Sequence, residues 1–346
     1  MARTADMKIN TAQWPLFDEF PKLATLLAPV KLADLPTPVQ AIPALGGNAW
    51  IKRDDLTHRV YGGNKIRKLE FVLTEIRRKH SREVFTLGAT GTNAGIAVSM
   101  ICAQENIPCS IITFPQADSA TVRRNQAWMQ KFNARFDVQP SLWQAVLRYY
   151  LHPARRRKGS YFLFAGCSNP SSTFGYLNAA FELREQIRAG ACPEPADIIV
   201  PVSSGSTLAG LTLGVALAGL SSRVTGIRVA AEKLGPFAAC TPAVVEKMMA
   251  QAMTTIRQQH SGRSFGKMPG VIMNGDYFGS GYGDSTAAAQ AAIAVFEQAT
   301  GLPLESTYSG KAAAAFLDRL ATQDKPVLFW NTFNSRRFPD DAASFS

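Results

Sequence analysis

The chain has 346 residues, of which 46% are hydrophobic and 18% are charged, and its formal net charge is +11. This length predicts two domains or lobes with an ample core, and the composition is that of a soluble globular enzyme. The cations are scattered, and their densest cluster, residues 155–158, has no interleaved aromatic side chains, which argues against a nucleic-acid-binding protein. A positive field would instead favour an anionic cofactor and substrate.

The cysteines and histidines exclude two further classes. The five cysteines form no CxxC pair, so we expect reduced thiols in a cytoplasmic protein. No histidine lies near enough in sequence to a cysteine or to another histidine to suggest a zinc site, so no metal is expected. No signal-peptide pattern opens the chain, and the longest run of small apolar residues, 208–220, is too short to span a bilayer, so no membrane partner is expected.

Strands and helices are predicted to alternate along most of the chain. Strand 83–87, helix 96–105 and strand 109–114 follow one another, with a glycine-rich turn after the first strand, which indicates a parallel sheet. The other predicted helices are 21–28, 65–78, 120–132, 141–151, 173–188, 208–219, 243–260, 285–300 and 311–322, and the other strands are 50–53, 161–165, 197–201, 224–231 and 327–330. The predicted fold class is therefore α/β with mostly parallel sheets.

Lys65 follows two glycines and Asn64 and opens the helix predicted over 65–78. The glycines permit a tight turn and Asn64 is a good N-cap residue, so Lys65 lies at a loop-to-helix junction. A helix N-terminus and nearby cations, here Arg67 and Lys68, both lower the pKa of a lysine. A neutral lysine amine is a nucleophile that forms Schiff bases, although the motif alone fits a surface lysine equally well.

A serine- and glycine-rich turn separates strand 197–201 from helix 208–219. Its backbone amides, with the positive end of the helix dipole behind them, favour phosphate binding over a merely polar loop. No lysine stands at its end, so it is not a P-loop. The candidate phosphate ligands are Ser203, Ser204, Gly205, Ser206 and Thr207.

Three other loops could carry chemistry. Thr92 and Asn93 could bind a carboxylate, or they could belong to an ordinary strand–helix turn. Segment 274–283 alternates aromatic residues with glycines, so its tyrosines could reach into a cleft or simply pack a loop. Segment 308–311, Tyr-Ser-Gly-Lys, enters the helix 311–322.

These stretches, in this order, resemble the pyridoxal-phosphate enzymes of the tryptophan-synthase β-like fold (fold type II). Within that fold they are similar to the D-cysteine desulfhydrase and 1-aminocyclopropane-1-carboxylate deaminase family. The likeness covers about residues 35–332 and is strongest at residues 52–56, 62–70, 276–283 and 308–312. It implies a two-lobed molecule with helices on both faces of its sheets, and a homodimer. The large pyridoxal-phosphate-binding domain would comprise residues 1–67 and 161–346, and the small domain residues 68–160.

The resemblance also implies roles for single residues. Lys65 would carry pyridoxal 5'-phosphate as a Schiff base and shuttle the Cα proton of the substrate. Asn64 would bond the 3-oxygen of the cofactor, Ser309 would face its pyridine nitrogen, and loop 203–207 would hold its phosphate. The candidate substrate-binding residues are Thr92, Asn93, Ala94, Tyr282 and Tyr308, and the candidate catalytic residues are Lys65, Thr92, Tyr282 and Tyr308.

Ser309 bears on the type of reaction. The deaminases of this family have a glutamate at this point and the desulfhydrases a threonine, so the resemblance favours β-elimination from a small amino acid such as D-cysteine, with release of a 2-oxo acid and ammonia. The family's substrate-side histidine and arginine are replaced by Ala94 and Ile96, and its diglycine by Phe333 and Asn334, so a larger or differently charged amino acid stays open. The alternatives are a 1-aminocyclopropane-1-carboxylate deaminase, a biosynthetic enzyme performing γ-elimination, replacement or cyclisation, and a non-catalytic cofactor-binding homologue.

Overall fold

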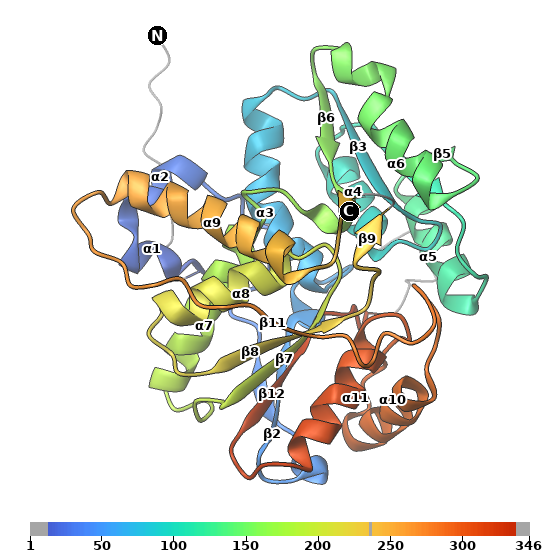
Figure 1. The fold of residues 1–346 in the computed structure, drawn as a ribbon. Helices are drawn as coiled ribbons and strands as arrows, with labels where there is room; N and C mark the ends of the chain where they lie inside the picture. Colours follow the sequence, from blue (N-terminus) through green and yellow to red (C-terminus); the bar gives the residue numbers. More distant parts are fainter. Residues whose placement is uncertain (1–12, 235–236, 337–346) are drawn as a thin grey trace.

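The structure is a computed structural model, and it describes residues 13–234 and 237–336 (Figure 1). Its strands are β1 (Val39–Ala41), β2 (Ala49–Arg53), β3 (Glu83–Ala89), β4 (Cys109–Phe114), β5 (Arg135–Val138), β6 (Ser160–Leu163), β7 (Asp197–Val202), β8 (Arg223–Arg228), β9 (Lys233–Leu234), β10 (Phe237–Ala238), β11 (Ile272–Asn274) and β12 (Val327–Asn331). Its α-helices are α1 (Leu16–Glu19), α2 (Pro21–Leu27), α3 (Asn64–Arg78), α4 (Asn93–Gln104), α5 (Ala120–Lys131), α6 (Leu142–Leu151), α7 (Thr173–Arg188), α8 (Ser206–Leu217), α9 (Pro242–Gln259), α10 (Ala287–Thr300) and α11 (Ser309–Leu320).

Two sheets organise the molecule. One has six strands in the order β1-β2-β12-β7-β8-β11, and the other has four in the order β5-β4-β3-β6. All neighbouring strands within them are parallel except β1 and β2. β7 is buried along its whole length, as expected for a parallel strand covered on both faces. The predicted α/β fold with mostly parallel sheets is confirmed.

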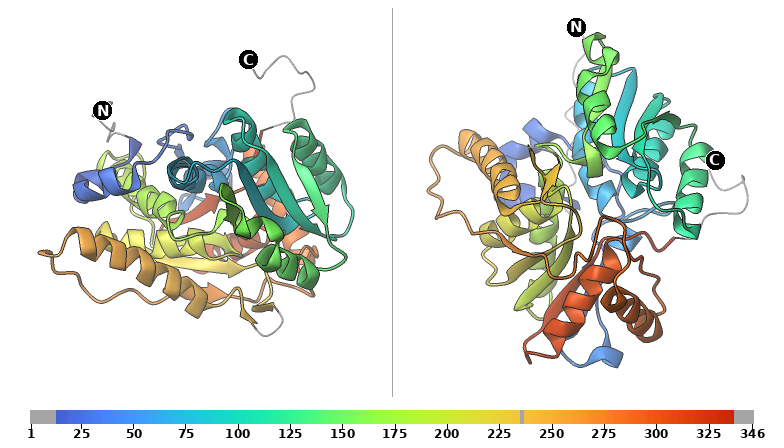
Figure 2. Two further views of the ribbon diagram at one scale, coloured as in Figure 1. Left: turned by 90° about the horizontal axis from the view of Figure 1, so that it is seen from above. Right: turned by 45° about the vertical axis from the view of Figure 1, so that its right-hand side comes forward.

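Helices cover both faces of the six-stranded sheet (Figures 1 and 2). Successive side chains of a strand point to opposite faces. On β12, Leu328 and Trp330 therefore join the apolar cluster that contains α7 and α8, whereas Val327 and Phe329 join the cluster that contains α10 and α11. The four-stranded sheet is covered in the same way, by α3 and α4 on one face and by α6 on the other.

A buried ionic network joins α3 to the six-stranded sheet and to α7. Arg67 on α3 lies 2.8 Å from Asp54 and 2.8 Å from Glu182 of α7, and Lys52 at the end of β2 lies 2.5 Å from Glu182. Trp330 also donates to Asp54, at 2.7 Å. The network joins two of the segments in which the family resemblance is strongest, residues 52–56 and 62–70, because their charged side chains are partners in space.

Most predicted elements are present within two or three residues of their expected bounds, and β4 and α7 coincide with the prediction. The prediction missed α1, β1, β5, β11 and the antiparallel hairpin of β9 and β10. These elements have two to four residues each, too few to show a periodic pattern. The predicted lobe boundaries remain a prediction. No helix within residues 13–234 and 237–336 is both long enough and apolar enough to cross a membrane.

Candidate active site

A cavity of about 700 Å³ lies at the carboxyl ends of strands from both sheets. Its lining includes the ends of β3, β4 and β7 and the segment directly after β12. Crevices at this end of parallel strands are the usual ligand sites of α/β folds. The predicted site residues that line it are Asn64, Lys65, Thr92, Asn93, Ala94, Ser203, Ser204, Gly205, Thr207, Tyr282 and Tyr308.

Lys65, the second residue of α3, is half-buried and lines the cavity. Its Nζ donates to Asn64 Oδ1 at 2.6 Å, and Asn64 Nδ2 donates in turn to Thr207 Oγ1 at 3.2 Å. Burial lowers the pKa of Lys65, and the neighbouring Cys167 and Glu305 offset only part of this effect. The amine therefore loses its proton more readily than an exposed lysine does.

Two expectations about this junction are wrong. Asn64 is not the N-cap, because α3 already begins at Asn64 and Gly63 occupies the N-cap with a φ of 99°. Arg67 does not lower the pKa of Lys65, because its guanidinium is buried away from it, between Asp54 and Glu182. The lowered pKa of the lysine comes from burial instead.

The loop after β7 has the donors of an anion site. α8 begins at Ser206, and its N-cap Gly205, with a φ of 93°, offers no side chain to the first amides of the helix. Ser168 Oγ lies 2.7 Å from Ser204 Oγ and 2.9 Å from Ser206 Oγ, which fixes both hydroxyls. Free amides at the start of a 12-residue helix, with hydroxyls beside them, fit the phosphate of pyridoxal phosphate. Ser206 itself is buried and does not line the cavity.

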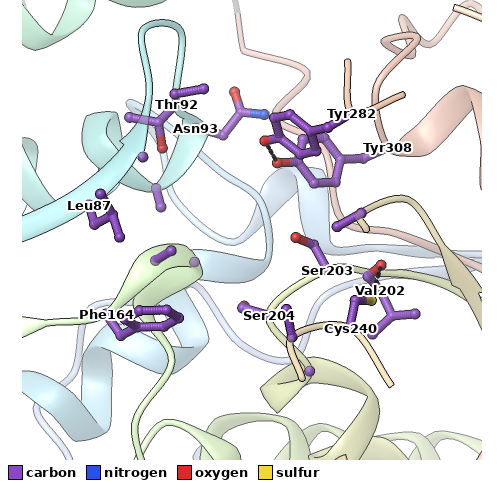
Figure 3. A pocket seen from close by; sticks show the side chains of 18 of the residues that line it. Leu87, Thr92, Asn93, Phe164, Val202, Ser203, Ser204, Cys240, Tyr282 and Tyr308 are labelled. Carbon is purple, nitrogen blue, oxygen red and sulfur yellow. Dashed lines mark hydrogen bonds between the residues drawn. The ribbon is translucent and has the colours of Figure 1, made fainter. Parts of the chain in front are cut away.

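Thr92 and Asn93 present donors on the opposite wall, which belongs to the four-stranded sheet (Figure 3). Asn93 Oδ1 accepts from Tyr61 and from Asn125, each at 3.0 Å, so its amide NH₂ remains available as a donor. Thr92 Oγ1 caps α4 by accepting from the Gly95 N–H at 3.2 Å, and its own proton is free to donate. This donor set at a helix N-terminus suits a carboxylate.

Tyr282 and Tyr308 lie side by side at the cavity with their hydroxyl groups hydrogen-bonded, and the Asn93 side chain extends toward them (Figure 3). Burial raises the pKa of Tyr282 to about 12, and burial also raises that of Tyr308 well above its usual value. Both phenols therefore stay protonated at neutral pH and can donate a proton or a hydrogen bond.

Glu305 is a lining residue that the sequence analysis missed. Its carboxylate accepts backbone N–H groups from Thr307, Tyr308 and Ser309 at 2.7–2.8 Å, ahead of α11. Ser309, by contrast, is fully buried outside the lining, where its Oγ accepts from the Glu305 N–H at 2.9 Å. An acidic residue just before a helix start was the signal in the sequence.

The three positions at which the sequence departs from the family pattern differ in their place in the structure. Ala94 and Phe333 line the cavity. Ile96 is buried in the apolar cluster beneath α4 and does not line it. The position at which the resemblance implies an arginine is thus part of the core at Ile96, whereas Ala94 and Phe333 shape the cavity.

The comparisons with known proteins agree with this geometry. Residues 30–332 match the family model described as pyridoxal-phosphate dependent enzyme. A D-cysteine desulfhydrase of Klebsiella pneumoniae subsp. pneumoniae is 27% identical over 321 residues, which cover 88% of this chain and 93% of that protein. A nocardicin C-9' epimerase of Nocardia uniformis subsp. tsuyamanensis is 26% identical over 322 residues, covering 89% and 93%.

The solved structures give the same result. The crystal structure of an ACC deaminase homologue matches with a TM-score of 0.75 and 25% identity over 90% of this chain and 94% of that one. A threonine deaminase isoform from Solanum lycopersicum shares the fold, with a TM-score of 0.64 over 92% of this chain and 90% of that one, at 14% identity. These matches confirm the resemblance inferred from the motifs. The chain belongs to the pyridoxal-phosphate-dependent enzymes of fold type II, in the family of the D-cysteine desulfhydrases and 1-aminocyclopropane-1-carboxylate deaminases.

Proposed function

We propose that this protein is a lyase or deaminase that uses pyridoxal 5'-phosphate to remove the Cα proton of an amino acid and to eliminate its β substituent. The products are a 2-oxo acid, ammonia and the released group. One observation carries the proposal: the amine of Lys65, with its lowered pKa, lines the same cavity as the anion-binding loop 203–207 and the carboxylate donors of Thr92 and Asn93. The similarity to D-cysteine desulfhydrase supports the same reaction class.

Each part of the cavity has a task in this reaction. The cofactor, when bound, supplies an electron sink that makes the Cα–H bond of an amino acid acidic. Loop 203–207 binds the phosphate, and Thr92 and Asn93 hold the carboxylate of the substrate. Lys65 accepts the Cα proton, because burial leaves a larger share of its amine neutral near pH 7. The protonated phenols of Tyr282 and Tyr308 serve as the acid for the leaving group.

The test is a product assay on the purified protein supplied with pyridoxal phosphate. D- and L-amino acids with β leaving groups, and 1-aminocyclopropane-1-carboxylate, are each scored for ammonia and for the 2-oxo acid. Lys65→Ala should abolish turnover, and Tyr308→Phe should lower kcat by about 10²–10⁴, the usual contribution of a positioned acid.

Two outcomes would contradict the proposal. Formation of 2-oxobutyrate from 1-aminocyclopropane-1-carboxylate, with no product from the other substrates, would assign the chain to the deaminase branch. A protein that binds the cofactor but is inert to the whole panel would be a non-catalytic homologue.

A further inference from the structure

Helix α6 is apolar on two faces. Ala145, Val146 and Tyr149 pack in the cluster that covers the four-stranded sheet, together with Leu87 and Ile112. A helix that covers a sheet needs only this one apolar face, and its opposite face is normally polar. The second face of α6 instead carries Trp143, Leu147, Tyr150 and Leu151.

This second face of α6 lines the cavity. The described residues leave nine large apolar side chains exposed, and five of them line this one cavity. These five are Trp143 (42% exposed), Leu147 (40%), Tyr150 (57%), Leu151 (76%) and Phe237 (62%). Because Phe237 comes from the β9–β10 hairpin, two elements remote in sequence supply a single apolar mouth. A contiguous exposed apolar surface of this kind marks a binding site, and here it is continuous with the candidate active site.

Charge is confined to the inner end of the cavity. Among the described lining residues, only Lys65, Lys68 and Glu305 are charged. The cation of α6, Arg148, pairs with Asp137 at 2.7 Å and does not line the cavity. A second charged group on a ligand would therefore lose water at the mouth without gaining a partner, which is unfavourable.

We infer that the substrate is an amino acid whose β leaving group carries a large apolar portion, aliphatic or aromatic, which lies against α6 and the β9–β10 hairpin. The inference rests on the proposed function, because Thr92 and Asn93 fix the carboxylate end. Trp143 and Leu147 then act as specificity-determining residues. A cysteine side chain in the same position would leave the apolar mouth exposed to water.

The test measures binding to the holoenzyme rather than turnover. Alanine, 2-aminobutyrate, norvaline and norleucine, each as the D and the L form, are titrated while the absorbance of the bound cofactor is recorded, with cysteine and aspartate as polar comparators. Burial of each added methylene should lower Kd by about fourfold, so norleucine should bind roughly 60-fold more tightly than alanine. The fluorescence of Trp143 should change on norleucine binding, and Trp143→Phe should remove that change.

A matched pair of variants links the effect to α6. Leu147 and Leu26, which lies on α2 outside the cavity, are exposed to 40% and 38%. Leu147→Asp should reduce the preference for norleucine over alanine to less than about threefold. Leu26→Asp should keep the full preference of the wild type.

Three outcomes would overturn the inference. Equal binding of alanine and norleucine, or tighter binding of cysteine or aspartate, would refute it while the proposed function stood. If Leu147→Asp dissociated a dimer but left the dependence of Kd on the ligand's side-chain length unchanged, the second face of α6 would be a contact with another copy of the protein. A preparation with no absorbance from bound cofactor would refute the proposed function itself, and the inference with it.

Discussion

Lys65 is held in place by the buried network that Arg67 makes two residues further along α3. Arg67 donates to the carboxylates of Asp54 and Glu182, and Lys52 donates to Glu182 as well. Burial opposes ionisation of Glu182, but Arg67 and Lys52 outweigh it and lower the pKa of Glu182 to about 2. Burial also lowers the pKa of Lys52, although Glu182 lies 2.5 Å away. The attraction between the charges therefore outweighs burial for Glu182 but not for Lys52. The loss of any one of these charged side chains would therefore leave the remaining buried charges unbalanced.

Glu182→Gln should destabilise the fold by about 3–5 kcal/mol at pH 7, because it leaves two buried cations without enough counter-charge. The pKa of Glu182 in the folded state lies below the ordinary 4.5, so its contribution is present above pH 4.5 and is lost as the pH falls toward 2. Urea unfolding of wild type and variant at several pH values should therefore show their difference shrinking in that window.

Glu185→Gln is the matched control for this variant. Glu185 lies on the same helix, but its side chain is 46% exposed, and it pairs with Arg184 at 2.8 Å and with Arg188 at 3.1 Å. Arg184 keeps Glu19 as a second partner, so the loss of Glu185 should cost less than about 1 kcal/mol. Equal losses for Glu182→Gln and Glu185→Gln would show that the buried network does not fix α3.

At the scale of elements, α8 and the loop before it form the proposed anion site. Gly205 adopts a φ of 93° at the N-cap and leaves the amides uncovered. Gly205→Ala should cost about 1–2 kcal/mol of stability from the positive φ, since its Cβ would meet Met248 and Val245 only in ordinary contact at 3.4 Å. It should also weaken pyridoxal phosphate binding by about tenfold, because relief of the strained φ would move the amides at the start of α8. Urea unfolding and a cofactor titration measure the two effects.

Gly190 provides the comparison for this prediction. It follows α7 with a φ of 74°, and a Cβ there would have open space around it. Gly190→Ala should therefore cost similar stability and leave cofactor affinity unchanged. Loss of affinity in both variants would mean that the effect at Gly205 is general destabilisation.

The elements also mark how far the sequence could be interpreted. Long amphipathic helices such as α3 and buried strands such as β7 were predictable, because their periodicity or continuous burial is local information. β1 and β11 were not, because such short strands are fixed by their partners in the sheet. The many apolar residues of α6 are visible in the sequence, but which face of the helix lines the cavity depends on tertiary packing.

At the scale of the whole molecule, the site is assembled from segments more than 200 residues apart in sequence, from Lys65 to Phe333. The glycine, serine and tyrosine motifs identified the polar part of the lining around Lys65, since each of them follows a strand or begins a helix. Glu305 and Ser309 show the limit of prediction from sequence. Only the structure reveals that Glu305 lines the cavity and that Ser309 is buried behind it. The apolar mouth likewise arises only when α6 and the β9–β10 hairpin meet across one cavity.

The most direct test is whether Lys65 carries the cofactor. The purified protein is scanned for absorbance with pyridoxal phosphate, then reduced with borohydride and mapped by peptide mass spectrometry, for wild type and Lys65→Ala. The wild type should show a lysine-bound cofactor band at the edge of the visible range, with the reduced cofactor on the peptide containing Lys65, and Lys65→Ala should show neither. Absence of the band from the wild type, or a cofactor trapped on Lys68, which lines the same cavity, would contradict the account.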